Sequence, residues 1–315
     1  MAASLEVNAK TFYDDSYQNI EYAKFSRFVD RSLILHEAPL DTLHFKLVQN
    51  SSAADIVTLP RSLYTRCTTL VTLKLKSVTL VDVSSLPSFP TLKTLWLVAV
   101  KYPGDEFVKR LLSNCHVLQD LLVALFPSDN VTVFTASFYV TYSQPGKIMS
   151  CITSVKCLTL CLSTSKEVYP VGTVFQNLVH LRVCTCETEW VNLLLCMLRG
   201  CPNLQSLKLF QCRKLPAPKP RPCLKGSTLV PGCLSSSLKA LRWVDYEGRE
   251  EEKQVADLIL RTGSCLKKVT IFSKATDPNR KLEMLKELSS IPIAHLPLNV
   301  RSYSTEVVVK SSLRV

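Results

Sequence analysis

The sequence contains little glycine. Only 8 of its 315 residues are Gly, and neither G-x-G-x-x-G nor G-x-x-x-x-G-K-[ST] occurs. These two patterns form the loops that place backbone N–H groups around the phosphates of a bound nucleotide. The sequence therefore offers no glycine-rich phosphate loop of either class.

Two kinds of hydrophobic segment are also missing. No apolar run reaches the roughly 20 residues that a membrane-spanning helix needs. The N-terminal stretch MAASLEVNAKTFYDD lacks the basic flank and apolar stretch of a secretory signal. We therefore expect no membrane partner and an intracellular protein, cytoplasmic or nuclear. In that compartment the 13 Cys are expected to be reduced thiols.

No set of catalytic or metal-binding residues stands out. The five His are scattered, and no Ser/His/Asp or Cys/His arrangement rises above the background. A zinc site of the usual kind needs paired Cys, such as C-x-x-C twice. The nearest pairs, Cys184 with Cys186 and Cys157 with Cys161, lack a second pair. Cys161 and Cys184 also fall on expected outward or edge positions of a strand. We therefore expect that the chain is not an enzyme, requires no cofactor and has no metal-binding residues.

What the sequence does contain is a recurring leucine pattern. The stretch RGCPNLQSLKLF holds Leu204, Leu207 and Leu209 in the form L-x-x-L-x-L. Nine windows of this form occur, and their starts are 22 to 37 residues apart. Most separations lie in or close to the 20–29-residue range of leucine-rich repeats. The windows begin at Leu40, Leu70, Leu92, Leu118, Val155, Leu178, Leu204, Leu238 and Leu266.

This pattern predicts a stacked parallel sheet. Alternate residues of a strand face opposite sides, so the second and third Leu of each window point inward. A single unit cannot bury that stripe, whereas stacked units form one continuous core. The fold class is thus an α/β leucine-rich-repeat solenoid, a curved parallel sheet with helices or loops on its outer face. Helical spacing of apolar residues predicts helices at 105–114, 188–200 (with Thr188 as N-cap), 249–263 and 280–290.

Cysteine also recurs with the windows. Cys67, Cys115 and Cys201 each lie three residues before the first Leu of a window. A small, poorly hydrated side chain suits the tight turn that leads into the next strand. These three Cys are therefore interpreted as core residues.

Several segments interrupt the repeats. Residues 126–154 are β-prone and are interpreted as a degenerate repeat, and residues 216–233 hold five Pro and cannot form a regular helix. The last 25 residues have no clear partner, and we expect them to fray. The expected organisation is a lead-in at 1–24, repeats at 25–215, a Pro-rich linker at 216–233, a compact unit at 234–290 and a tail at 291–315.

The compact unit carries a specific resemblance. The stretch CLSSSLKALRWVDYEGREEEKQVADLILRTGSCLKKVTIFS, followed by KLEMLKELSS, resembles the FBD domain of plant F-box proteins. FSRFVDRSLILHEAPLDTLHFKL, at residues 25–47, is similar to the segment where those proteins pass from the F-box into leucine-rich repeats. The resemblance to the F-box/FBD/leucine-rich-repeat family implies an FBD cap at 234–290 and repeats that bind a protein substrate.

In that family the F-box docks on the Skp-type adaptor of a cullin ubiquitin ligase. No F-box is recognisable here, since its Leu-Pro start, paired Leu and Trp-Arg close are missing. Two hypotheses follow. The chain is the substrate-binding part of an F-box subunit of a cullin-type (SCF) ligase in ubiquitin-dependent degradation, or it is an F-box-less decoy or scaffold with no ligase role.

The net charge of +12 suggests where a partner binds. Eleven bases and only two acids, Asp41 and Asp120, occupy the outward positions of the nine windows. Such a face would attract an acidic or phosphorylated protein segment. Alternatively, these basic residues only form a solvated strand face without a ligand. Nucleic acid is a less favoured ligand, because few aromatic residues lie among the Lys and Arg residues. The candidate partner-binding residues are Lys74, Lys76, Lys93, Trp96, Lys156, Arg182, Lys208, Phe210, Lys239 and Arg242.

Overall fold

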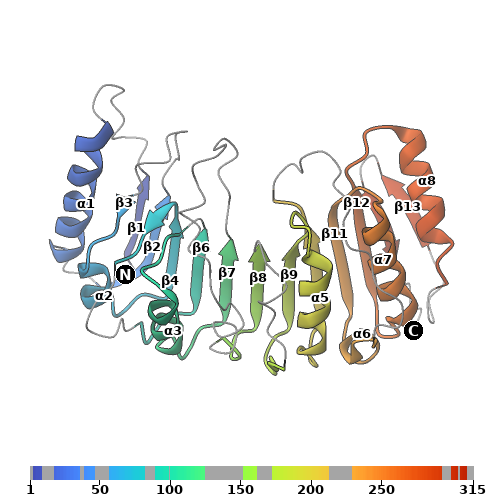
Figure 1. Ribbon diagram of the computed structural model, residues 1–315, viewed down its shortest axis with the longest axis horizontal. Helices are drawn as coiled ribbons and strands as arrows, with labels where there is room; N and C mark the ends of the chain where they lie inside the picture. Colours follow the sequence, from blue (N-terminus) through green and yellow to red (C-terminus); the bar gives the residue numbers. More distant parts are fainter. Residues whose placement is uncertain are drawn as a thin grey trace. The chain divides into compact units, whose positions relative to one another are not determined.

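All nine leucine windows form strands in the computed structural model (Figure 1). The model describes residues 3–8, 18–35, 39–46, 57–81, 89–98, 100–124, 152–161, 172–212, 229–292, 299–303 and 306–310. Residues 126–151 of the expected degenerate repeat and most of the Pro-rich segment lie outside the described residues. The chain divides into two compact units, Met1–Val155 and Lys156–Val315.

The first unit is built on five parallel strands. Their order is β1 (Ala3–Asn8), β2 (Leu40–Lys46), β4 (Thr72–Lys76), β6 (Thr94–Val98) and β7 (Asp120–Ala124). The register places Leu73 between Leu43 and Leu95, and all three are buried. Equivalent leucines of successive windows therefore stack on one another, as the repeat predicts.

Smaller elements complete the first unit. Two short strands, β3 (Val57–Thr58) and β5 (Val78–Thr79), pair in parallel beside helices α1 (Gln18–Leu35), α2 (Ser62–Arg66) and α3 (Asp105–Ser113). Helix α3 confirms the helix predicted at 105–114, and its Phe107 ring lies 5.9 Å from the Tyr64 ring of α2. Strand β1 and helix α1 precede the first leucine window and were not predicted, because neither contains the pattern.

The second unit continues the same architecture. Five parallel strands follow one another: β8 (Cys157–Cys161), β9 (His180–Cys184), β10 (Ser206–Phe210), β11 (Ala240–Tyr246) and β12 (Lys268–Ser273). Their inward leucines, such as Leu207 and Leu209, are fully buried.

The C-terminal residues join this sheet. Strand β14 (Glu306–Lys310) pairs antiparallel with β12, and β13 (Asn299–Tyr303) pairs antiparallel with β14. The expectation that the last 25 residues have no clear partner is therefore wrong for residues 299–303 and 306–310. The segment EVVVK consists mainly of β-branched Val and lies against the free edge of β12, whose backbone groups it pairs.

The described residues of the second unit include four helices, of which α5 (Trp190–Arg199), α6 (Gly232–Ser236) and α7 (Glu250–Thr262) follow one another along one face of the sheet (Figure 1). With α8 (Pro278–Ser289), they confirm the predicted helices at 188–200, 249–263 and 280–290. Thr188 is not the N-cap, since α5 begins after Glu189 without a side-chain cap bond. No helix among the described residues has both the length and the apolar character required to cross a membrane.

Aromatic side chains join the helices to the sheet. The Trp190 ring of α5 lies 5.8 Å from the Trp243 ring of β11, which lies 5.1 Å from the Tyr246 ring. All three side chains are at most 1% exposed. This edge-to-face stack identifies the inward face of β11, so the alternate residue Arg242 lies on the opposite face.

The three Cys that precede leucine windows are core residues, as predicted. Their carbonyl oxygens accept the N–H of the Leu that opens the window, at 3.3 Å for Cys67, 3.1 Å for Cys115 and 3.3 Å for Cys201. All three are at most 2% exposed. Burial raises the pKa of the Cys67 thiol to about 11 and that of Cys115 to about 12, so both stay neutral.

Gly200 ends α5 where the chain passes close to the preceding connection. A Cβ atom there would lie 2.3 Å from the Thr173 carbonyl oxygen, and the Gly200 carbonyl accepts the Phe175 N–H at 2.7 Å. We expect Gly200→Ala to lower the free energy of unfolding by about 1–3 kcal/mol, because the backbone must shift to relieve the clash. Urea denaturation measures the change. Gly232→Ala is the control, since a Cβ at Gly232 meets no atom within 4 Å; equal losses in both variants would contradict the prediction.

Glu252 is a buried acid in the first turn of α7. Its Oε2 accepts the backbone N–H of Glu247 at 2.9 Å and that of Arg249 at 3.1 Å. Burial raises the pKa of this carboxyl from 4.5 to about 7, although the two N–H bonds act in the opposite direction. The fold therefore favours the protonated form over the pH range between these values.

The raised pKa of Glu252 predicts a stability that declines with pH. Because the folded pKa exceeds the unfolded one, the stabilising contribution is complete below about pH 4.5 and is lost as pH rises through 7. The loss is at most about 3 kcal/mol. Urea denaturation at pH 5 and pH 7.5 should show a smaller decline for Glu252→Gln than for the wild type. Glu250→Gln, exposed in the same turn, should keep the full decline; an unchanged decline in Glu252→Gln would refute the assignment.

Candidate functional site

Three cations stand side by side on the second unit. Lys208 of β10 is in register with Arg182 of β9 and with Arg242 of β11. Neighbouring strands lie about 4.8 Å apart, so the three side chains occupy one row across the sheet. The row faces away from the stack of Trp190 on Trp243. We call these three residues the cation row.

The cation row has an unbalanced charge. Among the described residues, no carboxylate forms an ion pair with any of the three side chains. Burial lowers the pKa of Lys208, and the charges of Arg182 and Arg242 lower it further. Aromatic rings accompany the row, with Lys208 Nζ 5.4 Å from the Phe210 ring centroid and the Arg242 guanidinium 4.8 Å from that of Phe272. A bound anion would relieve the repulsion among the three cations.

Two other predicted cations of this unit lie outside the row. Lys156 and Lys239 come directly before β8 and β11 and are exposed. Lys239 Nζ donates a hydrogen bond to Gln205 Oε1 at 3.1 Å. Both lysines therefore lie before the strands begin, where successive side chains do not yet alternate between the two faces of the sheet.

The first unit has a smaller group of the predicted residues. Lys74 of β4 is in register with Trp96 of β6, and its Nζ lies 3.9 Å from the ring centroid. Trp96 is 37% exposed although it is large and apolar. Lys76 follows Lys74 on the same face, whereas Lys93 precedes β6 and is exposed. The structure thus brings Lys74, Lys76 and Trp96 together.

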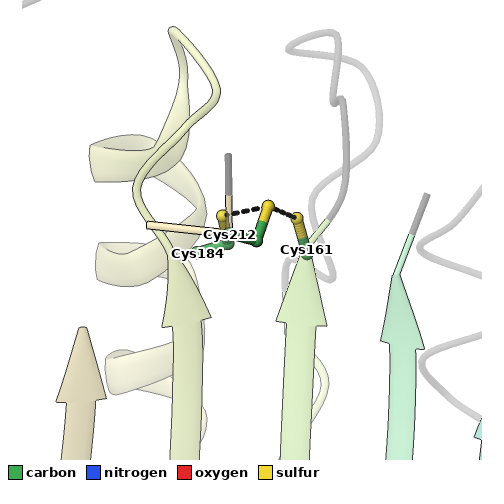
Figure 2. Close-up of side chains that lie close together, drawn as sticks. All are labelled: Cys161, Cys184 and Cys212. Atoms are coloured by element: carbon green, nitrogen blue, oxygen red, sulfur yellow. Dashed lines mark hydrogen bonds between the residues drawn. The ribbon is translucent and has the colours of Figure 1, made fainter. Parts of the chain in front are cut away.

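The second unit also contains a cluster of thiols. Cys161 and Cys184 are the last residues of β8 and β9, and Cys212 follows β10 by two residues. The Cys212 Sγ lies 3.0 Å from the Cys161 Sγ and 3.2 Å from the Cys184 Sγ. Figure 2 shows the Cys212 side chain between the other two. Cys161 and Cys184 are each 3% exposed, so their expected outward or edge positions are buried. The reason is the contact with Cys212, whose thiol covers the ends of both strands.

A fourth sulfur adjoins this cluster. The Cys186 Sγ lies 3.7 Å from the Cys212 Sγ and accepts the backbone N–H of Cys212 at 3.3 Å. Hydrogen bonds with Cys161, Cys186 and Cys212 lower the pKa of Cys184. The bond with Cys184 raises the pKa of Cys161, and bonds with Cys161, Cys184 and Cys186 raise the pKa of Cys212. The Sγ atoms of Cys161, Cys184 and Cys212 lie within 4.8 Å of one another, so all three can reach one metal ion.

Sequence reasoning missed Cys212 because it looked for Cys pairs that are close in the chain. The useful signal was the offset within each window. Cys161 and Cys184 follow their window starts by six residues, and Cys186 and Cys212 follow theirs by eight. Stacked windows bring equal offsets side by side, so these four positions converge at one end of the sheet.

The fold and its outward face define an α/β repeat protein with a basic surface on the sheet. Family models extend this description: an "FBD" model matches residues 226–271, and a model of "FBD-associated F-box protein At5g56370, LRR repeats" matches residues 35–137. The FBD match covers the beginning of the compact unit expected at 234–290. The second match confirms that the windows of the first unit are leucine-rich repeats.

Relatives in Arabidopsis thaliana give the family. The "Probable FBD-associated F-box protein At1g32375" is 46% identical over 366 residues, covering 89% of this chain and 87% of the relative. The protein named F-box/FBD/LRR-repeat protein At5g56420 is 34% identical over 364 residues, covering 89% and 86%. The chain belongs to the family of FBD-associated F-box proteins with leucine-rich repeats. Because the aligned span of 366 exceeds the 315 residues of this chain, the first relative contains segments without a counterpart here.

Proposed function

We propose that this chain is a non-enzymatic recognition module, a leucine-rich-repeat solenoid that binds an acidic or phosphorylated protein segment across the outward face of its sheet. In this proposal it is the substrate-binding part of an F-box subunit of a cullin-type ubiquitin ligase, and catalysis belongs to the other ligase subunits. The observation that carries the proposal is the cation row of Arg182, Lys208 and Arg242.

The chemistry of the row favours carboxylates and phosphates. Guanidinium groups bind both anions through two parallel N–H···O bonds, and the ammonium group between them adds a point charge. Phe210 and Phe272 lie beside the row and offer apolar contact. An extended acidic segment that crosses the strands would meet all three cations in succession. Lys74 and Trp96 provide a second contact of the same kind on the first unit.

Nucleic acid is the competing ligand for a basic surface. Proteins that bind single strands combine cations with aromatic platforms on which successive bases stack. The row has aromatic rings, but its cations cover those of Phe210 and Phe272. The rings are therefore engaged within the protein, which favours a protein segment over a stacked base.

Reversal of the cation row should abolish binding of acidic peptides. We expect the triple variant Arg182→Glu, Lys208→Glu and Arg242→Glu to weaken the affinity for a labelled peptide of Asp, Glu and phosphoserine residues by tenfold or more. Loss of one charge-assisted hydrogen bond alone costs about 1.5–3 kcal/mol. Fluorescence anisotropy at fixed ionic strength measures the dissociation constant.

A matched control variant distinguishes binding by the cation row from attraction by the net charge of the protein. The control is a triple variant with the same change of net charge at positions on α5 and α8: Arg199→Glu, Lys281→Glu and Lys286→Glu. Its affinity for the peptide should stay within twofold of the wild-type value. Equal weakening by both triple variants would show attraction by net charge alone and overturn the assignment of the row. Tighter binding of a single-stranded oligonucleotide than of the peptide would favour the nucleic-acid alternative.

The alternative function is an F-box-less decoy or scaffold that binds partners without a ligase role. The lack of a recognisable F-box pattern in the sequence motivates this alternative. A pull-down with a purified Skp-type adaptor distinguishes the two functions, with a fusion that carries a family F-box at its N-terminus as positive control. We expect the chain as it stands to retain the adaptor if it is a ligase subunit. Retention by the fusion alone would establish the decoy or scaffold and leave the peptide-binding prediction intact.

A further inference from the structure

We propose that Cys161, Cys184 and Cys212, with Cys186 as the fourth ligand, form a binding site for a Zn²⁺ ion in the second unit. The site is separate from the cation row and does not depend on the proposed function. Three successive windows supply its ligands, so an ion bound there would link the ends of β8, β9 and β10.

The geometry of the three closest sulfurs suits a single ion. A tetrahedral zinc–thiolate site with Zn–S bonds of about 2.3 Å places its sulfurs about 3.8 Å apart. The Cys186 and Cys212 Sγ atoms are already 3.7 Å apart, while Cys212 lies 3.0 Å from Cys161 and 3.2 Å from Cys184. Moving Cys212 less than 1 Å away from Cys161 and from Cys184 would bring both pairs to that spacing. The Cys186 Sγ is not among the three sulfurs that lie within 4.8 Å of one another, so its side chain would have to turn toward the ion. Figure 2 shows the three closest thiols pointing toward one another from separate segments.

These contacts differ from those of the other buried thiols. The Cys115 thiol donates to the Leu111 carbonyl at 3.2 Å, and the Cys233 thiol donates to the Leu198 carbonyl at 3.1 Å. Each is thus satisfied by the backbone, as expected of a core Cys. In the cluster the sulfurs converge on one another, and none of the eleven described Cys forms a disulfide. Convergence of thiols is what a metal site requires and what a core packing position does not.

The donor set indicates the kind of ion. Thiolate ligands select soft or borderline ions such as Cu⁺ and Zn²⁺, and Zn²⁺ is most often held by four ligands. The fourth sulfur, Cys186, therefore favours Zn²⁺ over an ion that takes two or three thiolates. Binding would release the four thiol protons and leave a complex of charge −2, so affinity should fall as pH is lowered.

The surroundings can compensate this charge. Cys184 lies two residues after Arg182 on the same strand and face, and it is in register with Phe210, which lies two residues after Lys208. The anionic cluster would therefore adjoin two members of the cation row along the strands, at roughly 7 Å per two residues. The backbone N–H of Cys212, which points at the Cys186 sulfur, would stabilise a thiolate ligand there.

Cobalt titration of the full chain tests the proposal. The reduced protein, freed of metal with a chelator, should bind one equivalent of Co²⁺ with the sulfur-to-metal charge-transfer band and the intense visible bands of tetrahedral thiolate coordination. Zn²⁺ should displace it and raise the thermal unfolding temperature. Cys161→Ser and Cys212→Ser should each lower the affinity for Co²⁺ at least tenfold. Cys196→Ser, a half-buried thiol of α5, is the matched control and should bind as the wild type does.

A second measurement requires no variant. X-ray absorption at the zinc edge of the loaded wild-type chain should show four sulfur ligands at about 2.3 Å. A shell of nitrogen and oxygen ligands, or equal loss of affinity in Cys196→Ser, would overturn the proposal. Failure of the wild-type chain, kept reduced throughout the titration, to bind Co²⁺ would also overturn it.

Discussion

The burial of alternate leucines between neighbouring strands is the interaction on which the rest of this structure depends. Leu207 and Leu209 are fully buried, yet no single window could cover them, since their partners are the leucines of the windows on either side. Each such side chain contributes about 2 kcal/mol on burial. The register of the strand pairing is therefore strongly constrained. A slip by one residue would bury Lys208 in the core and expose Leu207 and Leu209 to water.

The same register also determines which side chains are neighbours on the outward face of the sheet. A register that aligns leucines inside also aligns whatever the chain places between them outside. Arg182, Lys208 and Arg242 form a row because each occupies the same position of its window. Cys161 and Cys184 adjoin for the same reason, one row further along the strands. The groups of charged residues and thiols on this face therefore combine residues from several windows that are far apart in the chain. No single window contains a whole group.

The leucine windows predicted nine strands, and helical spacing of apolar residues between them predicted four helices, because the burial of an apolar stripe has a period that the sequence displays directly. Strand β1, helix α1 and the hairpin of β13 with β14 lack that period and depend on the edge or surface that the other strands create. All three residues of the cation row were among the predicted cations, whereas the predicted Lys93, Lys156 and Lys239 precede their strands. The Cys212 contact was not predictable, since it arises where the chain leaves β10 and turns back over two neighbouring strands.

Strand direction sets a limit on how this architecture can change. Every strand from β8 to β12 runs parallel to its neighbours, but β14 meets β12 antiparallel and occupies the edge where another repeat would pair. A duplicated window added after β12 would find that edge taken by a strand of the opposite direction. Lineages that gain or lose repeats in this part of the fold should therefore do so between existing windows, with the FBD unit and its terminal hairpin kept together as one inherited end.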